Sequence, residues 1–112
     1  MWRDDALLLD IVMAASDARA FVRNLDFEAF LNSRLHQNAV IRSLEVIGEA
    51  AGKLTAEFKD IHPSLPWRDM INMRHRLIHA YGDVSLDVVW DIIQNDLPSL
   101  IATLKPLIPP DI

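Results

Sequence analysis

The apolar residues of this chain recur with the period of α-helices. Between residues 4 and 23 they follow one another at steps of three and four, which places them on one face of a helix. From His36 to Phe58 the steps alternate between four and three, as at a helix–helix contact. No stretch alternates strictly between apolar and polar residues, so we expect an all-α fold without a sheet. The two stripes comprise Leu8, Ile11, Val12, Ala15, Ala18 and Val22, and Val40, Leu44, Ile47, Ala51, Leu54 and Phe58.

Capping and turn residues divide the chain further. Asp4 or Asp5 suits the start of the first helix, and Asp26 suits the start of a short helix after it. Two prolines define a loop over residues 62–66, after which Trp67 opens a helix of about three turns. Ser85 can cap a last helix, which Pro98 kinks or restarts, with Asp96 available as the new cap. We therefore expect one domain over residues 1–112, an all-α bundle of four main helices plus one short helix.

Two glycines in the second long helix need a separate interpretation. Gly48 to Thr55 superficially resembles a phosphate-binding loop. The spacing is one residue short, Leu54 stands where Ser or Thr is required, and no strand precedes it. Small residues that permit close packing of helices are the preferred explanation.

Composition and charge restrict the function. The 112 residues contain no cysteine, so a disulfide or a thiolate site is excluded. A net charge of −5 argues against broad, non-specific binding of nucleic acid, although a local basic site remains possible. The acidic N-terminus does not fit a secretory signal, and the apolar runs are too short for a bilayer. We expect a cytoplasmic protein that does not associate with a membrane.

The stretch from Met73 to Gly82 concentrates the chemistry of the chain. It holds Arg74, His75, Arg76, His79 and Tyr81. Arginine presents a planar set of donors that suits phosphate, and histidine exchanges protons near neutral pH. Such a pair suffices for RNA cleavage without a metal, in which a 2′-hydroxyl attacks the neighbouring phosphorus.

Helical geometry limits how this pair can act. On one regular helix, Arg74 and His79 point about 140° apart. Either the helix ends so that His79 turns round, or two copies of the chain contribute to one site. The second possibility makes dimerisation part of the mechanism and raises the local basic charge.

Other interpretations of the stretch remain open. Cationic residues are common near the C-terminus of a helix, where they often have no catalytic role. His75 and His79 could share a metal, but no third ligand has a suitable spacing, so we expect no metal and no other cofactor. His36 and His62 fit a helix start and a loop.

The chain also resembles a known family. Arg74, four further residues, His79, one residue and Tyr81 match the R-(four to six residues)-H-x-Y signature of HepT-like toxins in the HEPN superfamily. The resemblance extends over essentially the whole chain. It includes residues 39–51, Pro66-Trp67-Arg68, residues 73–81, Val89-Trp90 and Asp96-Leu97-Pro98.

This resemblance implies an α-helical homodimer with its motif residues in a cleft between subunits. It implies a metal-independent endoribonuclease, the toxin of a type VII-like toxin–antitoxin pair. Arg74 and His79 would be catalytic, with His75, Arg76 and Tyr81 supporting the site or contacting RNA. The antitoxin would be an MntA-like nucleotidyltransferase that transfers AMP to Tyr81, where a bulky anion would obstruct the cleft and repel RNA.

Two rival hypotheses remain. The chain could be a non-catalytic HEPN subunit that supports a partner nucleotidyltransferase, or a purely structural helical dimerisation module. No pattern in the sequence indicates residues that recognise particular RNA bases, so the sequence does not indicate the RNA target.

Overall fold

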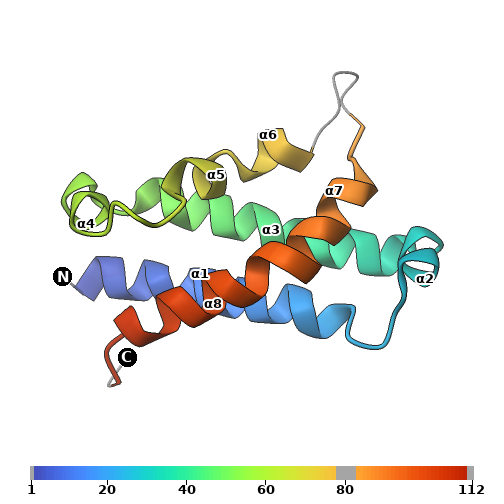
Figure 1. The fold of residues 1–112 in the computed structure, drawn as a ribbon, viewed down its shortest axis with the longest axis horizontal. Coiled ribbons are helices and arrows are strands. Elements are labelled where there is room, and N and C mark those ends of the chain that lie inside the picture. Colours follow the sequence, from blue (N-terminus) through green and yellow to red (C-terminus); the bar gives the residue numbers. More distant parts are fainter. Residues whose placement is uncertain (1, 78–82, 111–112) are drawn as a thin grey trace.

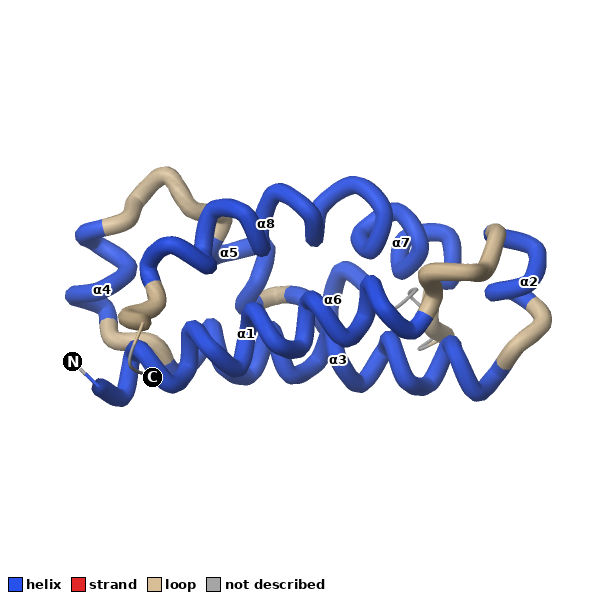
Figure 2. The backbone as a smooth tube through the Cα atoms, turned by 90° about the horizontal axis from the view of Figure 1, so that it is seen from below, coloured by secondary structure: helices blue, strands red, loops and turns tan. Residues whose placement is uncertain are grey.

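Two long antiparallel helices form the frame of the molecule. The computed structural model describes residues 2–77 and 83–110, which form helices and connecting loops but no strand. Helix α1 spans Trp2–Phe21 and helix α3 spans Arg34–Lys53, and the two run side by side along the molecule (Figures 1 and 2). The predicted all-α class is confirmed.

The core lies where these two helices face each other. All six residues of the first stripe are buried, five of them in α1 and Val22 just after it, and Val40, Leu44 and Ile47 of α3 are completely inaccessible to solvent. Burying a side chain of this size stabilises the fold by about 1.5–3 kcal/mol. The apolar period therefore predicted correctly which faces of α1 and α3 meet.

Polar side chains cap the N-termini of the two helices that follow α1. The Asp26 carboxylate accepts a hydrogen bond of 2.8 Å from the backbone N–H of Ala29, which starts helix α2 (Phe27–Leu31) as predicted. The Ser33 hydroxyl then accepts from the N–H of His36 and starts α3 at Arg34. The second long helix therefore begins two residues earlier than expected.

The predicted cap at Asp4 is wrong. Helix α1 already begins at Trp2, and the Asp4 side chain is buried within its first turns. Its carboxylate accepts from the backbone N–H of Thr55 at 3.0 Å and from the Thr55 hydroxyl at 2.8 Å. Asp4 thus joins the start of α1 to the end of α3, a contact between residues too distant in sequence for a local pattern to reveal.

The second long helix also ends earlier than its apolar pattern suggested. Leu54 has extended backbone angles, and the Thr55 hydroxyl caps a separate helix, α4 (Ala56–Ile61), by accepting from the N–H of Phe58. Phe58 still packs against the core and contacts the rings of His62 and Trp67, so the apolar period continues through the break. The spacing of buried residues therefore continues past Leu54, although the helix itself ends there.

Two further predicted helices are divided. The helix that Trp67 opens breaks at Asn72 into α5 (Trp67–Ile71) and α6 (Met73–Leu77). The last helix consists of α7 (Leu86–Asp91), a π-helical turn η1 (Ile92–Asp96) and α8 (Leu97–Leu104), followed by the 3₁₀ turn η2 (Lys105–Leu107). The predicted number of helices is therefore not confirmed.

These divided helices cover the long pair. The α5–α6 segment lies along α3, whereas η1 and α8 lie against α1, and the ends of the described chain meet at one end of the molecule (Figure 1). Neither Ser85 nor Asp96 makes the predicted side-chain cap. No helix within residues 2–77 and 83–110 is long and apolar enough to cross a membrane.

Candidate active site

Arg74 and His75 lie on helix α6, which is described over Met73–Leu77. Met73 and Leu77 are buried toward α3 and fix the orientation of this part of the helix. They leave the side chains of Arg74 and His75 exposed to solvent.

A close approach between backbones sets the distance of this segment from α3. A Cβ atom added to Gly48 would lie 3.2 Å from the carbonyl oxygen of Met70 and 3.4 Å from the Cβ of Met73. The small-residue interpretation is therefore confirmed for Gly48. It does not hold for Gly52, where an added Cβ would meet no atom within 4 Å.

Arg74 borders a hollow that also contains acidic side chains. The hollow has a volume of about 230 Å³ and is lined by Glu45, Gly48, Glu49, Ile71 and Arg74. The Glu49 carboxylate accepts a hydrogen bond of 3.2 Å from Arg42. Within the described part of the chain, no carboxylate lies within 4 Å of the Arg74 guanidinium, which keeps its donors available for an anion. Nothing in the local sequence around Arg74 indicated these two glutamates, because they belong to another helix.

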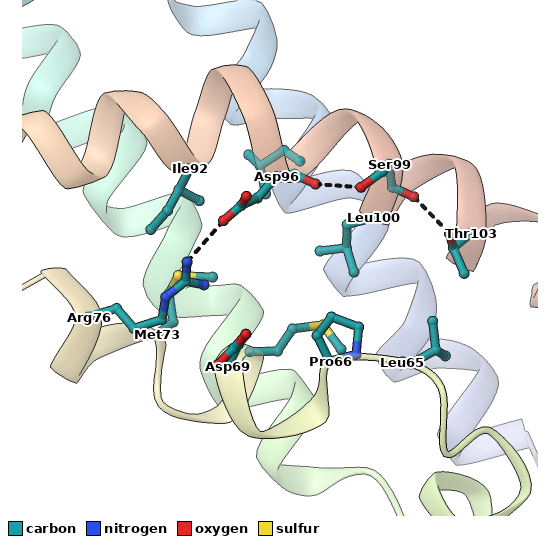
Figure 3. A pocket seen from close by; sticks show the side chains of 12 residues that line it. Leu65, Pro66, Asp69, Met73, Arg76, Ile92, Asp96, Ser99, Leu100 and Thr103 are labelled. Atoms are coloured by element: carbon teal, nitrogen blue, oxygen red, sulfur yellow. Dashed lines mark hydrogen bonds and ion pairs between the residues drawn. The ribbon is translucent and has the colours of Figure 1, made fainter.

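Arg76 points into a different cavity. Its Nη2 donates a hydrogen bond of 2.9 Å to the Asp96 carboxylate, which ties α6 to the end of η1 (Figure 3). The ion pair borders a cavity of about 290 Å³ whose wall also includes Asp69, Met73 and Leu100. Residues two positions apart on an α-helix differ by about 200° in direction. Arg74 and Arg76 therefore point to opposite sides of α6.

His79 and Tyr81 lie outside the described residues, as does Gly82. The described residues on both sides are joined, because the N–H of Ser85 donates to the carbonyl of Leu77 at 2.6 Å. Arg74 and His75 are therefore the predicted site residues that the structure brings to one exposed surface.

The other histidines have partners elsewhere. The His36 ring is hydrogen-bonded to the Ser33 hydroxyl, and the His62 ring packs 4.7 Å from Phe58 between centroids. Within residues 2–77 and 83–110, no three His, Asp or Glu side chains are grouped so that they could hold a metal ion.

Comparison with known proteins decides the family. The model of the family described as "Ribonuclease HepT-like" matches residues 11–107, which include the whole motif segment. The chain belongs to this ribonuclease HepT-like family. The resemblance that the motif indicated is thereby confirmed.

Individual relatives agree with the family match. The HepT-like chain is 46% identical over 93 residues to a protein of Thermococcus cleftensis named "Probable ribonuclease HepT", covering 83% of this chain and 84% of the relative. It is 39% identical over 103 residues to a protein of Methanocaldococcus jannaschii named as a candidate RNase, covering 92% and 85%. No solved structure matches the chain at a comparable level of significance.

The surroundings of α6 suggest what this HepT-like site can do chemically. Arg74 offers a charged donor set at the surface, suited to the oxygens of a phosphate. Asp96 was expected to cap a helix, and it instead holds Arg76. No local spacing rule connects residues 76 and 96, because they lie on different helical segments, α6 and η1.

Proposed function

We propose that this HepT-like protein is a metal-independent endoribonuclease, the toxin of a type VII-like toxin–antitoxin pair. The observation that carries the proposal is the family match across residues 11–107, with relatives that are named as ribonucleases. The Arg74 side chain is exposed, and among the described residues no carboxylate lies within 4 Å of its guanidinium, which agrees with binding of a phosphate.

In the proposed reaction, His79 transfers protons and Arg74 stabilises negative charge. His79 removes the proton from the 2′-hydroxyl, whose oxygen forms a bond to phosphorus while the bond to the 5′-oxygen breaks. The leaving oxygen takes a proton from the histidine of the site, and the products are a cyclic phosphate and a free 5′-hydroxyl. Arg74 stabilises the charge that builds on the non-bridging oxygens, with His75, Arg76 and Tyr81 in support.

We further propose that the site is completed by a second copy of the chain. The angle of about 140° between Arg74 and His79 on a regular helix prevents one helix from directing both at the same phosphate. Ile71 is exposed, with 39% of its surface accessible, lines the hollow beside Arg74 and offers an apolar contact for such a copy. A homodimer would also concentrate the basic charge of two motif segments against an acidic protein.

The proposed test is cleavage of total RNA in the presence of EDTA. The protein is freed of any partner, and wild type is compared with His79→Ala and Arg74→Ala. We expect cleavage by the wild type, with losses of about 10²–10⁴-fold for His79→Ala and about 10²–10³-fold for Arg74→Ala. Arg68→Ala removes another exposed arginine, on the neighbouring helix α5, and should retain most activity. Light scattering should show that all four proteins remain dimers.

Control by a partner is a separate part of the proposal. An MntA-like nucleotidyltransferase would transfer AMP to Tyr81 and so place a bulky anion at the RNA site. Incubation with the partner and labelled ATP should label wild type but not Tyr81→Phe. Equal labelling of that variant would remove Tyr81 from the proposal.

A non-catalytic subunit is the second candidate function. The acidic hollow favours it, because Glu45 and Glu49 beside Arg74 would repel RNA phosphates. In that case Arg74 would contact the partner nucleotidyltransferase or its nucleotide. Absence of cleavage by folded, dimeric wild type would contradict the nuclease and favour this subunit, whereas a stable dimer with neither property would indicate the structural dimerisation module.

A further inference from the structure

A hollow that contains two arginines lies at the end of helix α1. Its volume is about 370 Å³, and it is lined by Arg19, Val22, Arg23, Leu25, Trp90 and Gln94. The first four of these residues belong to the last turns of α1 and the turn that follows, and the other two come from α7 and η1. None of the described residues of the motif segment, 73–77, lines this hollow.

One of its two arginines is fixed in orientation. Arg19 is half-buried, and its Nη1 donates to the carbonyl of Ile93 at 3.3 Å and to Oε1 of Gln94 at 3.2 Å. Both bonds use the same nitrogen, so the planar guanidinium keeps further donors for another acceptor. The bond to Oε1 also leaves the Gln94 amide nitrogen as a donor.

The second arginine adds a like charge to the same hollow. Arg23 lies in the turn after α1 and lines the same hollow as Arg19, where two like charges repel each other. Arg23 is exposed, and among the described residues no carboxylate lies within 4 Å of either guanidinium. An anion between the two arginines would remove this repulsion, and phosphate suits their planar donor sets.

The remaining wall is aromatic and apolar. The Trp90 ring is packed against the rings of Phe27 and Phe30, with centroid distances of 5.7 and 5.2 Å. These two contacts fix its position. Val22 and Leu25 contribute aliphatic surface to the same hollow. Aromatic and aliphatic walls beside cations are suited to a nucleobase that is linked to a phosphate. The volume is also in the range of small-molecule sites.

We propose that this hollow binds a nucleoside monophosphate, with its phosphate between Arg19 and Arg23. The base lies against the wall that contains Trp90, where the Gln94 amide donates to an acceptor on the base. The nucleotide can be free, or it can be one residue of an RNA strand that continues toward the motif. Only the RNA source rests on the proposed function, and binding of a free nucleotide does not.

The test measures binding rather than cleavage. Isothermal titration of the full chain uses AMP, inorganic phosphate and a six-residue 2′-O-methyl RNA, which lacks the attacking hydroxyl and cannot be cut. We expect AMP to bind more tightly than phosphate, and Arg23→Gln to weaken AMP about tenfold by removing a charge-assisted contact. Arg3→Gln removes an exposed arginine near the opposite end of α1 and should change the affinity less than twofold.

A spectroscopic readout separates the site from general attraction of anions. In ¹H–¹⁵N spectra, AMP should shift the indole N–H signal of Trp90 but not that of Trp67, which donates to the His62 carbonyl elsewhere in the molecule. Equal binding of AMP and phosphate, an unchanged Trp90 signal, or full affinity of Arg23→Gln would each overturn the proposal. Competition between the RNA and AMP would identify RNA as the source, and its absence would identify the free nucleotide.

The outcome does not depend on the nuclease. AMP binding by a protein that cuts no RNA would support the nucleotide site and contradict the proposed nuclease function. RNA cleavage by a protein that binds no AMP would support the nuclease function and contradict the nucleotide site.

Discussion

The long pair α1–α3 and the α5–α6 segment are stabilised in different ways. The long helices have 20 residues each and meet through a continuous apolar stripe. The α5–α6 segment, described over residues 67–77, is held by a few buried anchors, a close approach at Gly48 and the ion pair of Arg76. The motif arginine is therefore carried by the part of the molecule that depends most on its neighbours.

This difference indicates where function and stability separate. A change in the long pair should lower the stability of the whole domain, because burial there is extensive. A change under the α5–α6 segment should act mainly on the local order of that segment, since few contacts hold it. Comparing global unfolding with local amide exchange tests this distinction directly.

The largest effect is expected in the long pair. Leu44→Ala removes a fully buried side chain from α3 and should lower the free energy of unfolding by about 2–5 kcal/mol. Urea denaturation would measure the change. Leu35→Ala is the matched control on the same helix, because Leu35 is 76% exposed and its loss should change stability by less than about 0.5 kcal/mol. Similar losses in both variants would show that α3 is not buried as described.

An intermediate effect is expected where the two regions touch. Gly48→Val should lower the free energy of unfolding by about 1–3 kcal/mol, because its side chain would collide with the backbone of Met70 and with Met73. Gly52→Val, four residues further along α3, has open space and should have little effect. Amide exchange should accelerate in α5 and α6 more than in α1. Equal tolerance of both substitutions would contradict the close approach.

The smallest effect on stability is expected at the ion pair. Asp96→Asn removes the charge that holds Arg76, and the pair is partly exposed, so the cost should be about 0.2–1 kcal/mol. Amide exchange within residues 73–77 should nevertheless accelerate, because α6 has few other anchors. Glu49→Gln removes the exposed ion pair with Arg42 and serves as the control, since it should leave exchange in α6 unchanged. Faster exchange in both variants would show that the Arg76 pair has no special role.

Local patterns predicted those features whose causes are local. The apolar period identified the buried faces of α1 and α3, and the short-range bond from Asp26 to Ala29 was predicted from a capping preference. The motif spacing indicated the family, which the family match confirms. It identified Arg74 as a candidate although its surroundings were unknown.

The places where helices break depended on contacts that are distant in sequence. Asp4 holds Thr55 at the end of α3, and Asp96 is turned toward Arg76 by a π-helical segment. Both carboxylates have the residue type of a helix cap, and their actual partners lie 51 and 20 residues away. A capping preference cannot predict such partners, because the competing bond exists only after the helices have packed.

The sequence by itself determined an all-α chain, the buried stripes of its long helices and the motif that marks its family. These follow from helical period and residue chemistry, which act over a few neighbouring residues. Only the tertiary structure decided that Arg74 and Arg76 serve opposite sides of α6, that two glutamates accompany Arg74, and that Arg19 and Arg23 share a hollow with Trp90. The physical reason is that these side chains belong to different helices, whose relative positions are fixed only when the buried faces of the helices pack together.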